Sequence, residues 1–152
     1  MPIEAPLSRF KKKNLKLYIV FCIIFAVWFG YDGYFNESFE AKHTGPDGRP
    51  DSTMVFNQKA PFVLVAAAAL FTLYFGLIKN KKIIADERGL VLKKQVISYD
   101  SIEKIDKTHF ASKGFFVITY KDQHGKLTDK KISDRTYDNL QAVLEYLVAK
   151  IS

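Results

Sequence analysis

Two long runs of apolar residues dominate the first half of the chain. Residues 17–31 contain no charged side chain and correspond to about 22 Å of α-helix, and the uncharged run 61–78 corresponds to about 27 Å. A membrane-spanning helix needs about 17–25 apolar residues, so the second run is long enough. The first is long enough if Lys16 and the tyrosines at positions 31 and 34 lie in the two interfaces. We therefore predict transmembrane helices over 17–34 and 61–78, joined by a mostly irregular loop over 35–60.

A cleaved signal peptide is the alternative for the first run, because it too begins with basic residues and a short apolar core. A cleavage site needs small residues, whereas this segment has Trp28 and Phe29 where the site would lie, so an uncleaved anchor is favoured. A buried helix of a soluble protein is the alternative for the second run. Cys22 is preceded by Val20 and Phe21 rather than by small residues, which favours a packing role over lipid attachment.

Small residues recur along one side of each predicted helix. In lipid, small residues let two helices approach closely enough for van der Waals packing. We predict that these residues form the contact between the helices, with the alternative that they simply face lipid. The predicted contact residues are Cys22, Ala26 and Gly30 on the first helix and Ala69, Thr72 and Gly76 on the second.

From residue 82 the pattern changes to short runs rich in β-branched and aromatic residues. Residues 86–89 and 122–125 each end in glycine, which suits the turns of β-hairpins. We predict an antiparallel sheet of about five strands. The strands are expected at 83–85, 90–92, 96–99, 115–120 and 127–132.

The C-terminal segment predicts an amphipathic helix. Apolar residues at positions 137, 140, 144, 147 and 151 recur every three or four residues, and Asp134 or Thr136 is expected to cap the helix. We expect its apolar face to pack on the sheet, with partner binding as the alternative. The predicted fold is a membrane helical hairpin followed, over 82–152, by a small α+β domain.

Charge is distributed unevenly along the 152 residues, whose formal net charge is +7. Residues 1–16 carry five Lys or Arg and one Glu, the segment 31–60 carries three basic and five acidic residues, and 79–152 carries fifteen basic and ten acidic residues. Cytoplasmic flanks of membrane helices are enriched in Lys and Arg. We therefore expect both termini, including the basic segment 1–16, to be cytoplasmic and the loop 35–60 to lie outside.

The lysines beside the predicted spans indicate contact with anionic lipid, to which each contributes about 1 kcal/mol. The alternative is that these lysines serve only to set the topology. Nucleic-acid binding is disfavoured because the basic residues are interspersed with acidic ones. The predicted contacts are Lys11, Lys12, Lys13, Lys16, Lys79, Lys81 and Lys82, and Lys93, Lys94, Lys126, Lys130 and Lys131 extend this set.

No pattern in the chain predicts catalytic chemistry. The histidines at positions 43, 109 and 124 lack the paired spacing of a zinc site. A glycine-rich phosphate loop, a nucleophile elbow and a dinucleotide fingerprint are all missing from the sequence. We therefore predict no catalytic residue, no metal and no cofactor, and expect a protein that is not an enzyme.

Four short sequence segments resemble a known family: residues 84–90, 97–102, 103–105 and 137–140. Over residues 60–152 the chain resembles the small pleckstrin-homology-like domains, including the YcxB-like group, found at the cytoplasmic end of two-span bacterial membrane proteins. The resemblance implies a bacterial inner-membrane location and a seven-stranded fold with a terminal helix. The chain departs from it in having strand signals for only about five strands. It also lacks a Lys-x-Arg phosphate clamp in the first β-hairpin, so no phosphoinositide site is carried over.

Taken together, these features predict a membrane-anchored adaptor that presents its domain to lipid or protein. The alternatives are an accessory subunit of a larger transporter or respiratory complex, and an unrecognised enzyme. The expected partners are anionic lipid and either another membrane protein or a second copy of the chain.

Overall fold

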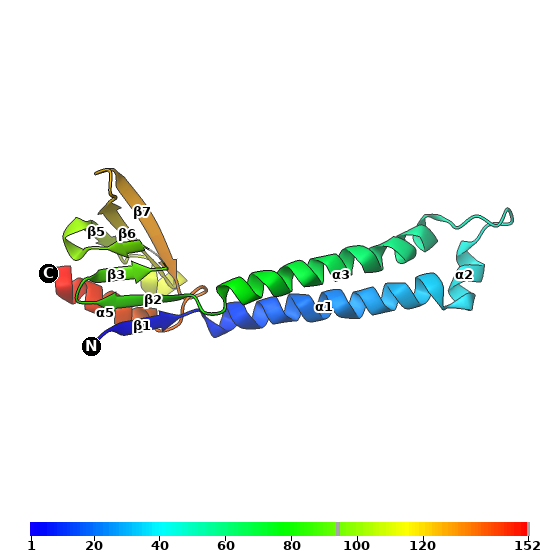
Figure 1. Cartoon of the computed structure of the whole chain (residues 1–152), viewed down its shortest axis with the longest axis horizontal. Coiled ribbons are helices and arrows are strands. Elements are labelled where there is room, and N and C mark those ends of the chain that lie inside the picture. Colours follow the sequence, from blue (N-terminus) through cyan, green and yellow to red (C-terminus); the bar gives the residue numbers. More distant parts are fainter. Residues whose placement is uncertain (94, 152) are drawn as a thin grey trace. The chain divides into compact units, whose positions relative to one another are not determined.

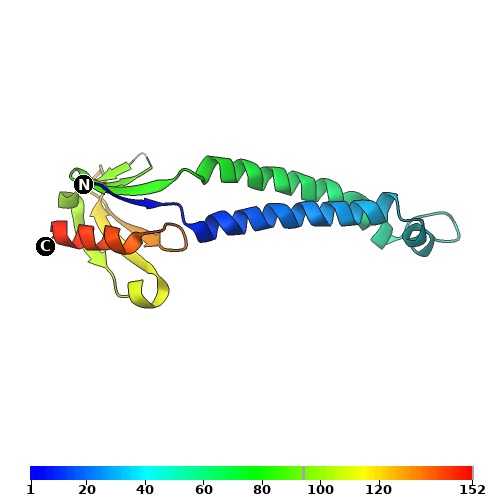
Figure 2. The same cartoon turned by 90° about the horizontal axis from the view of Figure 1, so that it is seen from below.

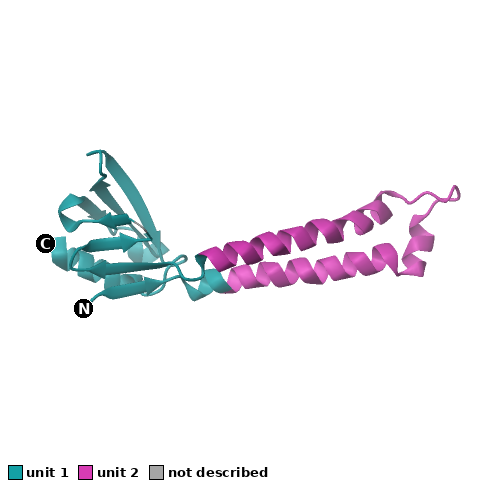
Figure 3. Ribbon diagram, viewed as in Figure 1, with its two compact units in different colours: residues 1–12, 78–152 teal, residues 13–77 magenta. Residues whose placement is uncertain are grey.

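The computed structural model describes residues 1–93 and 95–151, so Lys94, one of the lysines predicted to face lipid, lies outside the described residues. The chain divides into two compact units (Figure 3). One unit, the sheet domain, comprises Met1–Lys12 and Ile78–Ser152. The other, the helical hairpin, comprises Lys13–Leu77. In sequence, the helical hairpin is therefore an insertion into the sheet domain.

Three helices account for most of the insertion: α1 (Arg9–Tyr34), α2 (Glu37–His43) and α3 (Ser52–Ile78). The prediction of a mostly irregular loop over 35–60 is wrong, since α2 and the first turns of α3 lie within it. Helix α3 begins early because the Asp51 carboxylate accepts a hydrogen bond of 2.8 Å from the backbone N–H of Met54, an N-terminal cap. Pro61, expected at the helix start, instead lies inside α3.

Both long helices are long and apolar enough to cross a membrane, by length and composition. Only 11% of the residues in the most apolar window of each are buried within the protein. Large apolar side chains point outward on both, including Val27 at 68% exposure and Leu77 at 80%. The two apolar helices predicted from the sequence are thus present, and most of the residues in their apolar windows are not buried within the chain.

Helices α1 and α3 run side by side in the helical hairpin (Figure 1) and contact each other through rings: Tyr18 lies 5.9 Å from Phe71 between ring centroids, and Phe29 lies 5.3 Å from Phe56. Of the predicted α1 residues, Ala26 is buried, Cys22 and Gly30 are half-buried, and Gly30 lies near the ring of Pro61. On α3 the predicted side is wrong. Ala69, Thr72 and Gly76 are exposed, and the residues directed toward α1 are Ala68, Phe71 and Phe75, one position earlier. Aromatic rings, rather than small residues alone, decide which side of α3 packs.

The sheet domain has seven described strands in two antiparallel sheets rather than the single sheet of about five that we predicted (Figure 1). The first sheet has the order β1 (Ile3–Pro6), β2 (Lys82–Asp86), β3 (Gly89–Leu92), β4 (Gln95–Ile97), and the second has the order β5 (Ile102–Asp106), β6 (Phe115–Lys121), β7 (Leu127–Ser133). The predicted strands correspond to β2, β3, β4, β6 and β7. Strands β1 and β5 were missed, because one is very short and ends in proline and the other is largely charged.

Strand β1 pairs antiparallel with β2, from Ile3 opposite Ala85 to Pro6 opposite Lys82. The N-terminal segment, predicted as a basic tail, therefore completes the first sheet. Strands β1 and β2 are neighbours in space but are separated in sequence by the whole helical hairpin.

The core of the domain lies between the two sheets and α5 (Leu140–Ile151), which lies beside β1 (Figure 2). Leu140, Leu144 and Leu147 of the predicted apolar stripe are buried, as are Phe116 and Ile118 of β6. The helix begins later than predicted and neither Asp134 nor Thr136 caps it, because the preceding segment bonds instead to the N-terminal strand. Short helices η1 (Tyr99–Ser101) and α4 (Phe110–Lys113) complete the domain.

Candidate anion-binding site

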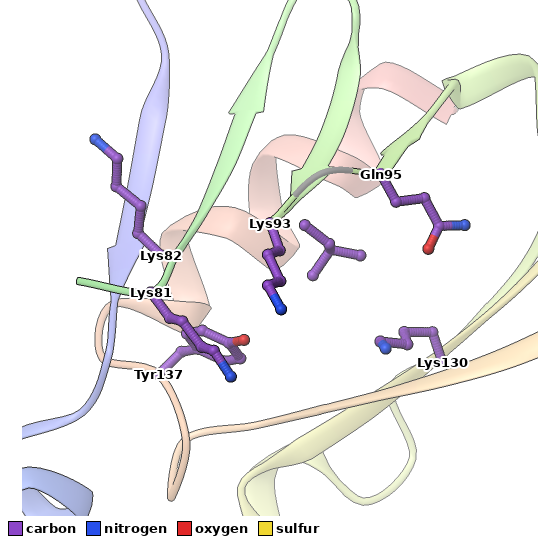
Figure 4. A pocket seen from close by; sticks show the side chains of 7 residues that line it. Lys81, Lys82, Lys93, Gln95, Lys130 and Tyr137 are labelled. Atoms are coloured by element: carbon purple, nitrogen blue, oxygen red, sulfur yellow. The ribbon is translucent and has the colours of Figure 1, made fainter. Parts of the chain in front are cut away.

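A cleft of about 470 Å³ opens in the sheet domain between one end of the first sheet and β7 of the second sheet (Figure 4). Among the described residues, four lysines and no carboxylate line it. The lining residues are Lys81, Lys82, Leu92, Lys93, Gln95, Lys130 and Tyr137.

The lysines come from three parts of the fold, since Lys81 and Lys82 are neighbours at the start of β2. Lys81 directly precedes β2, and its backbone N–H donates to the carbonyl of Ile78 at 2.9 Å, in the turn that ends α3. Lys93 follows β3 and has a φ of 60°, a left-handed conformation that is uncommon for residues other than glycine. Lys130 lies on β7 two positions before the buried Ile132, so the alternation of the strand directs both to the inner face.

Three of the four ammonium groups converge on the cleft. Figure 4 shows the side chains of Lys81, Lys93 and Lys130 extending toward the centre, whereas Lys82 extends away from it. The Lys82 ammonium instead lies 2.7 Å from a carboxylate oxygen of Glu4. Within the described part of the chain, Lys81, Lys93 and Lys130 form no ion pair with a carboxylate.

The remaining polar groups in the wall are neutral. Burial raises the pKa of Tyr137, which keeps its phenol protonated at ordinary pH and able to donate a hydrogen bond. Gln95 donates from Nε2 to the hydroxyl of Tyr120 at 3.0 Å, a bond that joins β4 to β6. Leu92 adds an apolar patch.

Such a wall favours an anion with several oxygen acceptors. Gathering like charges in one partly enclosed place raises the local positive potential, and a bound anion lowers that repulsion. An ammonium group supplies three N–H donors, and hydrogen bonds between ionised partners are the strong ones. The lining residues thus supply what a phosphate group needs to bind.

The lysines predicted to contact lipid are only partly brought together here. Lys81 and Lys82 line the cleft, while Lys79 is exposed outside it. Lys16 belongs to the helical hairpin, where its ammonium lies 5.7 Å from the centre of the Phe75 ring. The α1 lysines of the predicted set, Lys11, Lys12, Lys13 and Lys16, do not line the cleft.

Sequence reasoning did not find Leu92, Gln95 and Tyr137, and it included Lys93 and Lys130 only as extensions of the lysine set. No spacing in the chain links these positions, because they come from separate strands and from the segment before α5. Their one visible signal is that Lys93 follows a predicted strand and Lys130 lies within another.

His43 belongs to the helical hairpin, whereas His109 and His124 belong to the sheet domain. His43 Nδ1 is 2.8 Å from a carboxylate oxygen of Asp51, and the His109 ring lies 5.3 Å from that of Phe115. Among the residues that the structure describes, no three His, Cys, Asp or Glu side chains gather as a metal shell would require.

Comparison of the chain with family models, with curated proteins and with solved structures gives no match.

Proposed function

We propose that this chain is a membrane-anchored binding protein without catalytic activity, whose cleft holds the headgroup of an anionic lipid. The helical hairpin spans the inner membrane of a bacterium, with both termini and the sheet domain in the cytoplasm. One observation carries the proposal: among the described residues, three lysines that form no ion pair with a carboxylate converge on a cleft. One of them, Lys81, is the third residue after α3, an apolar helix of membrane-spanning length.

Exposure of the helices supports insertion into lipid. A core helix of a soluble protein is mostly buried, but here only 11% of each apolar window is buried. Leaving side chains such as Phe62, Leu70 and Leu73 in water would forgo about 1.5–3 kcal/mol apiece. The basic flanks at Arg9–Lys12 and Lys79–Lys82 favour a cytoplasmic location for the ends that join the sheet domain.

The short connection from α3 supports lipid as the ligand. Lys81 is the third residue after Ile78, the last residue of α3, so the chain can carry it at most about 11 Å from the helix end. A lysine held so close to a membrane-spanning helix meets headgroups at high effective concentration, and a weak site is then sufficient.

The strand count supports a pleckstrin-homology-like domain. That resemblance implies seven strands and a terminal helix, and the described part of the sheet domain has seven strands followed by α5. The helical hairpin between β1 and β2 takes the place of the first turn, so a phosphate clamp in an ordinary β1–β2 hairpin is not available to this chain.

Short-chain phosphatidylglycerol, titrated into the full chain in nanodiscs of neutral lipid, tests the proposal. Each lysine near anionic lipid contributes about 1 kcal/mol, so we expect K81Q, K93Q and K130Q each to weaken binding about fivefold, and the triple variant to weaken it further. Calorimetry measures the affinity at several salt concentrations.

The matched control is the triple variant K104Q/K107Q/K113Q, which removes the same charge from exposed lysines outside the cleft. We expect this control to bind like the unaltered chain. Equal losses in the two triple variants would mean that net charge, rather than the cleft, attracts the lipid. Failure of the unaltered chain to bind phosphatidylglycerol would refute the proposed function.

A further inference from the structure

The outer edge of β7 is the longest and most regular strand edge in the sheet domain. Among the described residues, β7 pairs only with β6 (Figure 1), over seven residues and without a bulge. The other edge strands are less open to a new strand. Strand β1 has four residues and ends in Pro6, β4 has three residues, and the register of β5 shifts between Ile102 and Lys104. Short strands, prolines and bulges protect an edge from pairing with another chain, and β7 has none of them.

The hydrogen bonds at the two ends of the β6–β7 pair show which backbone groups of β7 face this edge. The N–H of Asp134 donates to the carbonyl of Gly114 at 2.8 Å, and the N–H of Asp122 donates to the carbonyl of Lys126 at 2.9 Å. In an antiparallel pair, residues that bond to the neighbouring strand alternate with residues whose N–H and C=O point away from it. The even-numbered residues of β7 therefore bond to β6. Residues 127, 129 and 131 direct both backbone groups to the edge, where no described residue bonds to them.

Two opposite charges lie two positions apart along this edge. Asp129 and Lys131 are exposed, and the alternation of the strand places them on the same outer face of the sheet. One carboxylate oxygen of Asp129 accepts a hydrogen bond from the Thr119 hydroxyl at 2.7 Å. The Lys131 ammonium lies 3.7 Å from the centre of the Phe115 ring. Within the described part of the chain, neither charge forms an ion pair, so each is available to a partner.

The order of these charges favours a second copy of the same strand. Antiparallel pairing of two β7 strands about residue 129 would bring two Asp129 carboxylates together, and pairing about residue 131 would bring two Lys131 ammonium groups together. Pairing about residue 130 places Asp129 opposite Lys131 of the second copy, and two-fold symmetry repeats this ion pair. Opposite charges across two strands stabilise their pairing and like charges destabilise it. Charge complementarity therefore selects the register about residue 130.

Lys130 is the residue that this register places opposite its own copy. Lysines on an edge strand usually keep other strands away. The side chain of Lys130, however, lies on the inner face and extends toward the cleft (Figure 4), whereas both ion pairs form on the outer face. Two attractive pairs thus oppose one repulsive pair.

We propose that this chain forms a two-fold dimer in which the β7 strands of two copies pair antiparallel about residue 130. The two three-stranded sheets then become one continuous sheet across the dimer. Pairing along a single strand buries little surface, and small interfaces are weak. Copies anchored in one membrane meet at high effective concentration, so a weak interface is sufficient. The proposal rests on the membrane anchoring described under the proposed function, but it does not require lipid binding by the cleft.

Disulfide crosslinking of the full chain in phosphatidylcholine vesicles tests the register. In a Cys22→Ser background, which removes the single native cysteine, Asp129→Cys, Lys130→Cys and Lys131→Cys each place a thiol at the centre of one register. With a mild oxidant, we expect Lys130→Cys to form the disulfide-linked dimer about fivefold faster than the other two, because only its thiols lie directly opposite each other. Lys113→Cys, at an exposed position outside β7, is the matched control for random encounter.

Exchange of the two charges tests the ion pairs. In the Lys130→Cys chain, Asp129→Lys or Lys131→Asp turns both attractive pairs into repulsive ones, and each should slow crosslinking about fivefold or more. The double variant D129K/K131D keeps the net charge and again sets opposite charges across the two strands. It should restore the original rate, and this recovery would show that the single variants were slow because of charge rather than misfolding.

Three results would overturn the proposal. Crosslinking of Lys130→Cys no faster than that of Lys113→Cys would exclude the dimer, and faster crosslinking at position 129 or 131 would exclude this register. A double variant as slow as the single variants would exclude the charge pairing. Asp129 and Lys131 do not line the cleft, so each of these results leaves the proposed lipid binding standing. Failure of the unaltered chain to bind phosphatidylglycerol would likewise leave the dimer standing.

Discussion

Two glycines on α1, three positions apart, should differ in their response to the same substitution. A Cβ at Gly33 would lie 2.8 Å from the carbonyl carbon and oxygen of Asn57 and 2.9 Å from the nitrogen of Gln58, all backbone atoms of α3. A Cβ at Gly30 would lie 3.6 Å from the ring of Pro61, an ordinary van der Waals distance. Carbon atoms pack best at about 3.5–4.0 Å, so Gly33→Ala forces the helices apart by about 0.7 Å or more.

The free energies follow from these distances. Overpacking of a well-fitted contact costs about 1–3 kcal/mol, and the separation also strains the hydrogen bond from the Tyr34 hydroxyl to the Gln58 carbonyl, 2.9 Å long. Replacing Gly by Ala within a helix stabilises each variant by about 1 kcal/mol. This gain is the same in both variants, so it does not affect the difference in stability between them. We therefore expect Gly30→Ala to be more stable than Gly33→Ala by about 1–3 kcal/mol.

Unfolding of the full chain in mixed micelles with increasing denaturing detergent, followed by the emission of Trp28, gives the free energy of unfolding of each variant. The reasoning is refuted if the two variants are equally stable, or if Gly33→Ala is the more stable one. Either result would mean that the backbones of α1 and α3 do not approach closely at Gly33.

Two further predictions concern the sheet domain. The buried Ser8 hydroxyl accepts a hydrogen bond from the Lys11 N–H at 3.2 Å and donates one to the Arg135 carbonyl at 2.6 Å. Ser8→Ala should therefore lower the free energy of unfolding, measured by chemical denaturation, by about 1–2 kcal/mol. A loss below about 0.5 kcal/mol would contradict these bonds. The Tyr99 hydroxyl donates to the Asp86 carbonyl at 2.5 Å, and burial, with smaller contributions from the negative charges of Tyr146 and Asp86, raises the pKa of Tyr99 from 10.0 to about 12. The folded state therefore holds this proton more tightly than the unfolded state, so the stability it contributes is complete below pH 10 and is lost as the pH rises to about 12. Urea unfolding across this pH range should show that the free energy of unfolding falls more steeply for the unaltered chain than for Tyr99→Phe. Equal slopes for the two proteins would mean that another group causes the pH dependence.

Local patterns were sufficient where one periodicity spans a whole element. Long uncharged runs predicted both apolar helices, the glycine-ended turns at 86–89 and 122–125 marked two β-hairpins, and the spacing of Leu140, Leu144 and Leu147 predicted the buried face of α5. These patterns predict structure because the residues that are buried on one face of an element, or that cover a helix in lipid, lie close together in the chain.

Tertiary structure alone decided how distant segments meet. Strand β1 carries almost no strand signal and exists because β2, about eighty residues away in sequence, offers it backbone partners. On α3, small residues recur on more than one side, and only the fit of Phe71 and Phe75 against α1 selects Ala68 over Ala69. The cleft depends on the same kind of contact, since Lys81, Lys93 and Lys130 share no spacing and come together only when two sheets close around one core. Pairing energies between segments far apart in the chain are absent from local sequence patterns, and here they determine both the strand count and the site.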